Sequence, residues 1–253
     1  MIYKPSSHFF LLAVSLMVIS LTCSCKSNND DEDDPHTPIN TSGMTINTAL
    51  VWGNETLDVI SNTMYTDDQR PVKIFSPQLY ISEVRFINGD GDTIHENEVL
   101  FLSAINETIT LEDVPEAQYE QIIFTLGLPV YINKAVRPID FDMDHPLAPK
   151  SPNMWWNWDD GYIFARIEGL TNHQTPAIDS LTDNFSWHLG FSENAMEDIV
   201  LDLPAHGDWA LAFDIKHLFS QVRIPEEMFT LNVRRSQVDA NIAFVMRESF
   251  IIK

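Results

Sequence analysis

The chain has 253 residues, of which 44% are hydrophobic, and its 37 acidic against 15 basic side chains give a formal net charge of −22. This charge excludes a nucleic-acid-binding role, because affinity for phosphates comes mainly from Lys and Arg, and it favours metal cations and basic partners instead. The length is enough for one domain with its own hydrophobic core after a leader and a tether are set aside.

The first 25 residues indicate an export signal. Lys4 provides a positive start, and residues 9–21 form an apolar run that is too short to span a bilayer as a stable helix. The position of the two cysteines resembles a bacterial lipoprotein signal, whose first mature residue is a lipidated cysteine. Cys25 follows a small serine and is the favoured lipidation site, with Cys23 as the alternative. An ordinary cleaved signal or an uncleaved anchor is the competing interpretation.

Residues 26–43 are predicted to form a disordered acidic tether. Residues 30–34 are all acidic, so this segment cannot bury apolar surface. Such a tether resembles the export signals of surface lipoproteins in the bacteroidete group. We therefore expect a cell-envelope protein that is attached to the outer membrane by its lipid, with its domain facing the periplasm or the cell surface.

Residues 44–253 are predicted to form one domain built mostly from short, half-buried strands, because apolar and polar residues alternate in many segments. In residues 78–87 the phase slips, which indicates a β-bulge near Ser82. Residues 88–92 predict a hairpin turn. A calcium loop is the weaker interpretation there, because the twelfth-position glutamate is missing. The clearest alternating sets are Ile122, Phe124, Leu126 and Leu128; Ile199, Leu201 and Leu203; and Trp209, Leu211, Phe213 and Ile215.

One helix is predicted, at the C-terminus. Ser236 can cap it, with Asp239 three residues on, and Val238, Ile242 and Val245 or Met246 follow at helical spacing. The pattern contains no internal repeat and no second domain boundary. The predicted fold class is therefore all-β, an antiparallel β-sandwich with a short C-terminal helix.

Three of the six tryptophans stand within four positions, at Trp155, Trp156 and Trp158. Tryptophan needs apolar contact for its ring and an acceptor for its indole N–H, so this density predicts a packed core, a site or a partner surface. The strand that follows is predicted to turn Ile163, Ala165 and Ile167 to the core, with Tyr162, Phe164, Arg166 and Glu168 on the opposite face.

A histidine stands on either side of the cluster. Strand phase places Phe185, Trp187, Leu189 and Phe191 on one face, so His188 projects from the other face, between two small residues that leave room for a ligand. His145 lies in a proline-rich loop whose limited flexibility could hold the side chain in place. Because imidazole is a ligand for both copper and zinc, the two histidines are candidate metal ligands.

Several of these segments resemble the MbnP-like copper-binding family. The resemblance extends from about Thr45 to the end of the chain. Its central motifs are Met154–Trp158, the run Gly161–Phe164 into Ile167–Gly169, and Trp187–Gly190; the upstream segments Leu79–Ser82, Val84–Phe86, Val114-Pro115, Tyr119 and Ile122–Phe124 also fit.

The resemblance implies a secreted or lipid-anchored β-sandwich that binds one copper ion beside two histidines and a tryptophan oxidised to kynurenine. A diheme cytochrome of the peroxidase type is the implied partner that performs this oxidation. Carried onto this chain, His145 and His188 are the metal ligands, and Trp155 and Trp158, ahead of Trp156, are the candidates for oxidation.

One segment departs from the expected pattern. We expect a histidine-bearing segment before the final helix, but residues 232–236 carry Arg234 and Arg235 there instead. A scaffold that has lost copper is therefore one alternative.

A second alternative is a surface binding module for carbohydrate or protein, because Trp156 and Trp158 would share a face in an extended segment. An enzyme is not expected, since the carboxylates near the cluster have no recognisable nucleophile beside them. The predicted function is an extracytoplasmic, lipid-anchored copper-binding protein that acts in copper acquisition or handling.

Overall fold

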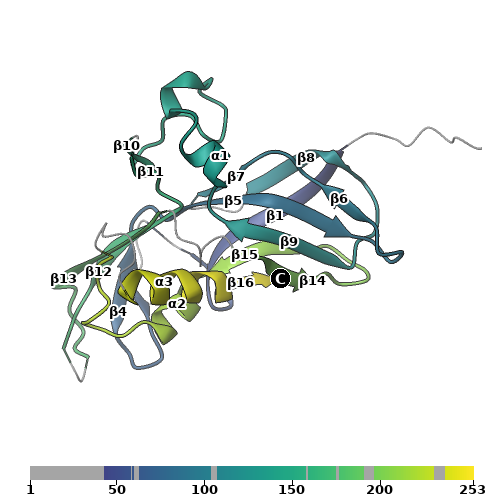
Figure 1. The fold of residues 1–253 in the computed structure, drawn as a ribbon. Helices are drawn as coiled ribbons and strands as arrows, with labels where there is room; N and C mark the ends of the chain where they lie inside the picture. The colour runs from purple at the N-terminus through teal and green to yellow at the C-terminus, as the bar shows by residue number, and fades with distance from the viewer. Residues whose placement is uncertain are drawn as a thin grey trace, which may run out of the picture. The chain divides into compact units, whose positions relative to one another are not determined.

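The computed structural model describes residues 43–57, 59, 63–103, 107–157, 159–174, 177–190, 197–230 and 237–253 (Figure 1). All of these belong to the compact unit Ile39–Lys253. The predicted signal with Cys23 and Cys25, the tether through residue 42, and Trp158, Phe191 and residues 232–236 lie outside the described residues, so the predictions made for them stay predictions. Within the described residues, no helix is both long and apolar enough to cross a membrane.

The described residues form two large sheets, in which every strand pair is antiparallel except β1 with β15 (Figure 1). The smaller sheet has the order β16-β15-β1-β2, with β8 also paired to β1. Its strands are β1 (Gly43–Trp52), β2 (Glu55–Thr56), β8 (Glu107–Pro115), β15 (Ala210–Asp214) and β16 (Phe250–Ile252).

The larger sheet has the order β14-β9-β5-β12-β4-β3, with β13 paired to β12 and with β6 and β7 paired to β5. A separate pair joins β10 to β11. The strands are β3 (Met64–Tyr65), β4 (Pro71–Ile74), β5 (Gln78–Ile87), β6 (Thr93–His95), β7 (Leu100–Ser103), β9 (Gln121–Leu126), β10 (Trp155–Asn157), β11 (Gly161–Tyr162), β12 (Ala165–Thr171), β13 (Asp183–Leu189) and β14 (Ile199–Asp202).

The core lies between the two sheets. Phe124 of β9 packs on Phe250 of β16 with ring centroids 5.0 Å apart, and Phe213 of β15 contacts the same ring at 5.0 Å. Ile122, Phe124 and Leu126 are fully buried, as their alternation predicts. The predicted all-β sandwich is therefore confirmed.

Two local predictions in β5 are also confirmed. The register between β5 and β9 shifts between Ser82 and Arg85, where Glu83 has a φ of 56°, and this bulge keeps apolar residues on both sides of it in the core. After β5, the side-chain oxygen of Asn88 accepts hydrogen bonds from the backbone N–H groups of Asp90 and Asp92, at 3.0 and 2.8 Å, and closes the hairpin turn.

The structure has more helix than we predicted. The C-terminal helix is present as α3 (Gln237–Glu248), which buries Ile242 and Met246, but β16 follows it and adds a strand to the smaller sheet. Short helical segments, α1 (Val130–Asn133) and a 3-10 turn (Pro138–Asp140), lie between β9 and β10.

The predicted strand that ends at Ile215 was too long. It stops at Asp214, whose carboxylate accepts hydrogen bonds from the N–H groups of Lys216 and His217 and so begins helix α2 (Ile215–Gln221). Ile215, Leu218 and Phe219, at helical spacing, form the buried face of α2.

Tyr162 and Phe164 were predicted to face away from the core, but both are fully buried. The Phe164 ring lies against the α-carbon of Gly127, where an added Cβ would come within 2.0 Å of it. Tyr162 lies between the rings of Tyr80 and Trp155, at centroid distances of 5.9 and 4.9 Å. The strand phase was correct, but segments from elsewhere in the chain cover the second face.

Glu96 is a buried carboxyl group whose replacement should stabilise the fold. It is 4% exposed, and its Oε2 has no hydrogen-bond partner among the described residues. Burial raises the pKa of Glu96, and the negative charges of Asp113 and Glu98 act in the same direction, while the backbone N–H groups of these two residues offset part of the shift. The pKa of Glu96 is higher in the folded protein than in the unfolded chain. The contribution of this group to stability is therefore fully present below its unfolded pKa and is lost as the pH rises through its folded pKa.

We therefore expect Glu96→Gln to be more stable than wild type by roughly 1 kcal/mol near neutral pH, with the difference disappearing in acid. Urea unfolding near neutral pH and in acid measures this, with Glu116→Gln, at an exposed acid, as the control. A Glu96→Gln protein that is less stable near neutral pH would contradict the expectation.

Candidate metal centre

The β12–β13 hairpin positions His188. In its register Arg166 lies opposite His188 and Glu168 opposite Ser186, so these four side chains share one face. The other face is core, where Trp187 is fully buried and its indole N–H donates to the carbonyl oxygen of Glu227 at 2.6 Å. The predicted phase of this strand is therefore confirmed.

The imidazole of His188 is held by a carboxylate. Its Nε2 lies 2.8 Å from Oε1 of Glu168 and 3.2 Å from the hydroxyl oxygen of Ser186. Because an ionised carboxylate can only accept, Nε2 carries the proton in the neutral ring and Nδ1 keeps its lone pair. No described residue makes a hydrogen bond to Nδ1. Metal-bound histidines in proteins are oriented by a carboxylate in the same way.

Arg166 fixes the carboxylate in turn. Its Nε and one terminal nitrogen donate to Oε2 of Glu168 at 3.1 and 2.9 Å, and its other terminal nitrogen donates to the carbonyl oxygen of Asn153 at 2.9 Å. Burial alone would raise the pKa of Glu168, but the hydrogen bonds from Arg166 and His188 outweigh it and lower the pKa. The carboxylate is therefore ionised at neutral pH.

Burial lowers the pKa of His188, and the positive charge of Arg166 acts in the same direction, while Glu168 offsets part of the shift. The imidazole is therefore neutral at neutral pH, which is the form that can bind a metal. The backbone of His188 is fixed as well, since its N–H donates to the Thr230 hydroxyl at 2.7 Å and its carbonyl accepts from that hydroxyl at 3.1 Å.

Trp156 lies over the same strand. A Cβ added to Gly190 would come within 2.3 Å of the six-membered ring of Trp156, so the indole rests directly on the glycine. Gly190 stands two residues after His188, which places this indole on the histidine side of the strand. We predicted that the small residues beside His188 leave room for a ligand. At Gly190 this room is filled by the Trp156 ring, which forms an aromatic wall.

Gly190→Ala should displace this wall. The added methyl group has no room beneath the ring, so we expect the Trp156 side chain to move, at a cost of about 1–3 kcal/mol in unfolding free energy. Tryptophan fluorescence and urea unfolding measure the two effects. Gly89→Ala is the control, because a Cβ added there meets only the flexible Glu120 side chain, at 3.3 Å. An unchanged fluorescence spectrum in Gly190→Ala would contradict the contact.

The other tryptophans of the cluster are placed differently. Trp155 packs edge-on against Tyr162 with an interplanar angle of 73°, and it contributes to the core. Trp158 lies outside the described residues. Among the described indoles of the cluster, the one placed against the His188 strand is Trp156, the member that the sequence ranked third.

His145 lies in a different setting. Its ring stacks on Phe141 with centroids 4.1 Å apart, and its Nδ1 accepts a hydrogen bond from the N–H of Leu147 at 3.0 Å. Nε2 therefore carries the proton of the neutral ring. A metal could bind Nε2 only if this proton moved to Nδ1, and the hydrogen bond from Leu147 to Nδ1 would then be lost. Burial lowers the pKa of His145.

The described residues do not bring the two histidines together by any hydrogen bond or ring contact, nor do they hold a group of three or more His, Cys, Asp or Glu placed to share a metal ion. Sequence reasoning missed Glu168, Arg166 and Ser186 as site residues. Their shared face could be read from the alternation, but the register that sets Glu168 beside His188 could not.

The fold and this cluster define an all-β sandwich that presents a carboxylate-oriented imidazole beside an indole. The family model of MbnP matches residues 41–236, and the chain belongs to this family. Among solved structures, the chain is similar to MbnP from Methylosinus trichosporium, with 13% identity, coverage of 78% of this chain and 82% of that chain, and a TM-score of 0.49. No curated protein matches the chain.

Proposed function

We propose that the protein is an extracytoplasmic, lipid-anchored copper-binding protein that acts in copper acquisition or handling and not as an enzyme. Family membership supports a copper-related role. The observation that carries the proposal is the imidazole of His188, which Glu168 holds at 2.8 Å with Nδ1 facing no partner among the described residues.

The donors at this position suit copper. Imidazole nitrogen is a ligand that copper accepts, and because Glu168 and Ser186 occupy Nε2 of His188, the nitrogen that is left for the metal is Nδ1. Bound copper would supply a redox-active cation there. His188 would bind it, and Glu168 would orient the ring and balance part of the charge.

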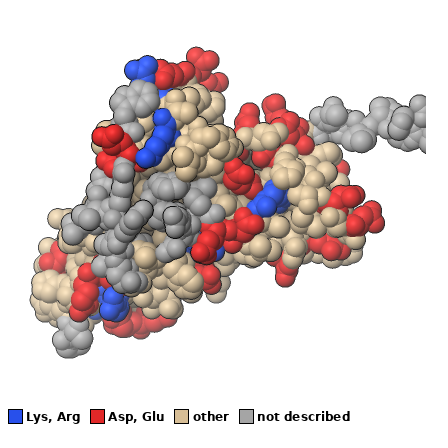
Figure 2. Space-filling view, viewed as in Figure 1, with Lys and Arg blue, Asp and Glu red and all other residues tan. Residues whose placement is uncertain are grey.

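The protein surface favours cation capture. Figure 2 shows Asp and Glu side chains spread over much of the visible face, with Lys and Arg groups few among them. The formal charge of −22 raises the local concentration of cations around the domain. Arg166 is a basic group on the same face, and its ion pair with Glu168 offsets its charge.

The remaining parts of the proposal come from the family resemblance. A lipid on Cys25 would anchor the chain in the outer membrane, His145 would be the second ligand, and one tryptophan near the metal would be oxidised by a diheme cytochrome of the peroxidase type. Trp156 gains weight among the candidates, because its ring lies on the His188 side of β13.

Metal analysis and intact mass of the protein purified from its own host test the proposal. We expect one copper per chain, and peptide mapping should place any kynurenine at residue 155, 156 or 158. Metal-free protein that ignores added copper would reject the function. The carbohydrate-binding alternative gains no support from the described tryptophans of the cluster, because Trp155 and Trp156 both lie against protein.

Glu168→Gln tests the orienting carboxylate. The amide preserves the shape but loses the charge and the fixed acceptor, so we expect copper affinity to fall by about 10–100-fold. Titration against a chelator of known affinity measures it. Asp202→Asn, which neutralises an acid outside the cluster, controls for the general loss of negative charge. Equal affinities for the two variants would show that Glu168 has no special role.

A further inference from the structure

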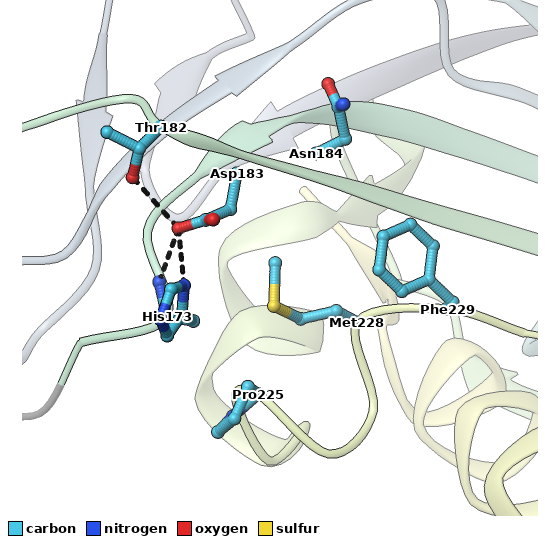
Figure 3. A pocket seen from close by; sticks show the side chains of 7 residues that line it. All are labelled: His173, Thr182, Asp183, Asn184, Pro225, Met228 and Phe229. Atoms are coloured by element: carbon cyan, nitrogen blue, oxygen red, sulfur yellow. Dashed lines mark hydrogen bonds and ion pairs between the residues drawn. The ribbon is translucent and has the colours of Figure 1, made fainter.

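A cavity of about 390 Å³ opens at the outer edge of β13, at the end away from His188. Its lining comes from the start of β13, from the loop before it, and from the segment that follows α2 (Figure 3). The volume lies within the range of small-ligand sites. None of its lining residues belongs to the His188 cluster.

The outer edge of β13 is paired for only part of its length. The N–H of Ser186 donates to the carbonyl of Met228 at 2.9 Å, and the carbonyl of Ser186 accepts from the N–H of Thr230 at 3.1 Å. His188 uses the Thr230 hydroxyl for the same two groups. Alternate residues of a strand direct their backbone groups to the same edge, so Asn184 must direct its N–H and C=O there too.

The partner segment leaves the strand before it reaches Asn184. The parallel bridge joins Ser186 to Phe229, and the chain on the other side of Met228 diverges toward Pro225. Neither backbone group of Asn184 has a partner on this edge among the described residues. Figure 3 shows the Asn184 side chain turned away from Met228 and Phe229, so the backbone of Asn184, rather than its amide, faces the cavity.

The rest of the cavity suits a side chain. Met228 is buried, whereas Phe229 is 50% exposed, and with Pro225 they supply an apolar wall. On the far side, three hydrogen bonds converge on Oδ2 of Asp183: from the N–H and Nδ1 of His173, at 3.0 and 2.8 Å, and from the Thr182 hydroxyl at 2.9 Å. Among the described residues, no Lys or Arg lines the cavity.

We propose that this edge of β13 binds an extended segment of another polypeptide. The segment would exchange two hydrogen bonds with the backbone of Asn184 and insert one bulky apolar side chain between Met228 and Phe229. Its flanking residues would be basic, because Asp183 lines the cavity and the protein carries a net charge of −22. Addition of a strand to an open sheet edge is a common way for proteins to recognise peptides. The site does not depend on copper.

Hydrogen exchange of the free protein tests the open edge. We expect the Asn184 amide to exchange far faster than the Ser186 amide, which is bonded to Met228. Equal protection of the two amides would overturn the proposal, because the edge would then be closed.

Titration of the ¹⁵N-labelled protein with the capped peptide Lys-Val-Phe-Val-Lys tests the occupant. We expect shifts at the amides of Asn184 and Phe229, an affinity about tenfold lower when the peptide phenylalanine is alanine, and weaker binding when glutamate replaces its lysines. Asn184→Pro removes the donor and should abolish the shifts. Phe229→Ser is a second test that does not depend on the folding of the proline variant. It replaces an exposed residue of the apolar wall and should weaken peptide binding. Shifts that map elsewhere, or none at millimolar peptide, would overturn the proposal.

Discussion

Replacing His188 by alanine should lower copper affinity by at least about a hundredfold, because even the loss of a residue that only orients a ligand costs 10–100-fold. The variant removes an imidazole that a carboxylate holds through Nε2 at 2.8 Å and whose Nδ1 has no hydrogen-bond partner among the described residues. A competitive chelator titration measures the affinity, and the copper spectrum reports whether nitrogen ligation is lost.

His206→Ala is the matched control, because His206 is exposed and lies outside the cluster. His145→Ala adds a second comparison: a comparable loss in that variant would make His145 a ligand and would require its ring to leave Leu147. Unchanged affinity in His188→Ala would reject the site.

Trp187→Ala should destabilise the domain by about 3–5 kcal/mol, the usual cost of truncating a buried large aromatic side chain. The Trp187 ring is fully buried and packs on Phe185 and Phe219 with centroids 4.7 and 5.0 Å away. Its N–H also satisfies the carbonyl of Glu227 at 2.6 Å. Urea unfolding measures the loss.

Trp187→Phe separates the two contributions. It keeps an aromatic ring but leaves the Glu227 carbonyl without this donor, so we expect a smaller loss of about 1–3 kcal/mol. Phe244→Ala, at a residue that is 56% exposed, should change stability by less than about 0.5 kcal/mol. A Trp187→Ala variant within 1 kcal/mol of wild type would contradict the packing described for β13.

Local pattern was enough to predict much of the fold. Burial alternates along β12 and β13 because successive side chains of a strand face opposite sides, and the sequence shows this periodicity directly. The bulge at Ser82 was visible as a slip of the same period. Helix α2 was missed because the strand pattern of Leu211 and Phe213 runs without a break into Ile215, although Leu218 and Phe219 continue at helical spacing.

The site was harder to predict because its contacts join distant segments. Strand phase placed His188 outside the core, but the pairing of β13 with β12 is what sets Glu168 beside it, twenty residues away. The contact of Trp156 with Gly190 likewise joins two hairpins, and no spacing within either hairpin reveals it. Tyr162 and Phe164 were misjudged for the same reason, since alternation shows which face a residue occupies but not what covers that face.

The parallel pairing of β1 with β15 bears on how the chain reaches its native state. Asn47 lies beside Ala210, so one edge of the first strand takes its partner from the last fifth of the chain, whereas β2 and β8 pair with the other edge. Contacts of such long sequence separation make folding slow, because the loop between the partners must close before the pairing stabilises anything. The smaller sheet is therefore completed only when β15 and β16 are present, and a chain that ends before Ala210 leaves one edge of β1 without its partner.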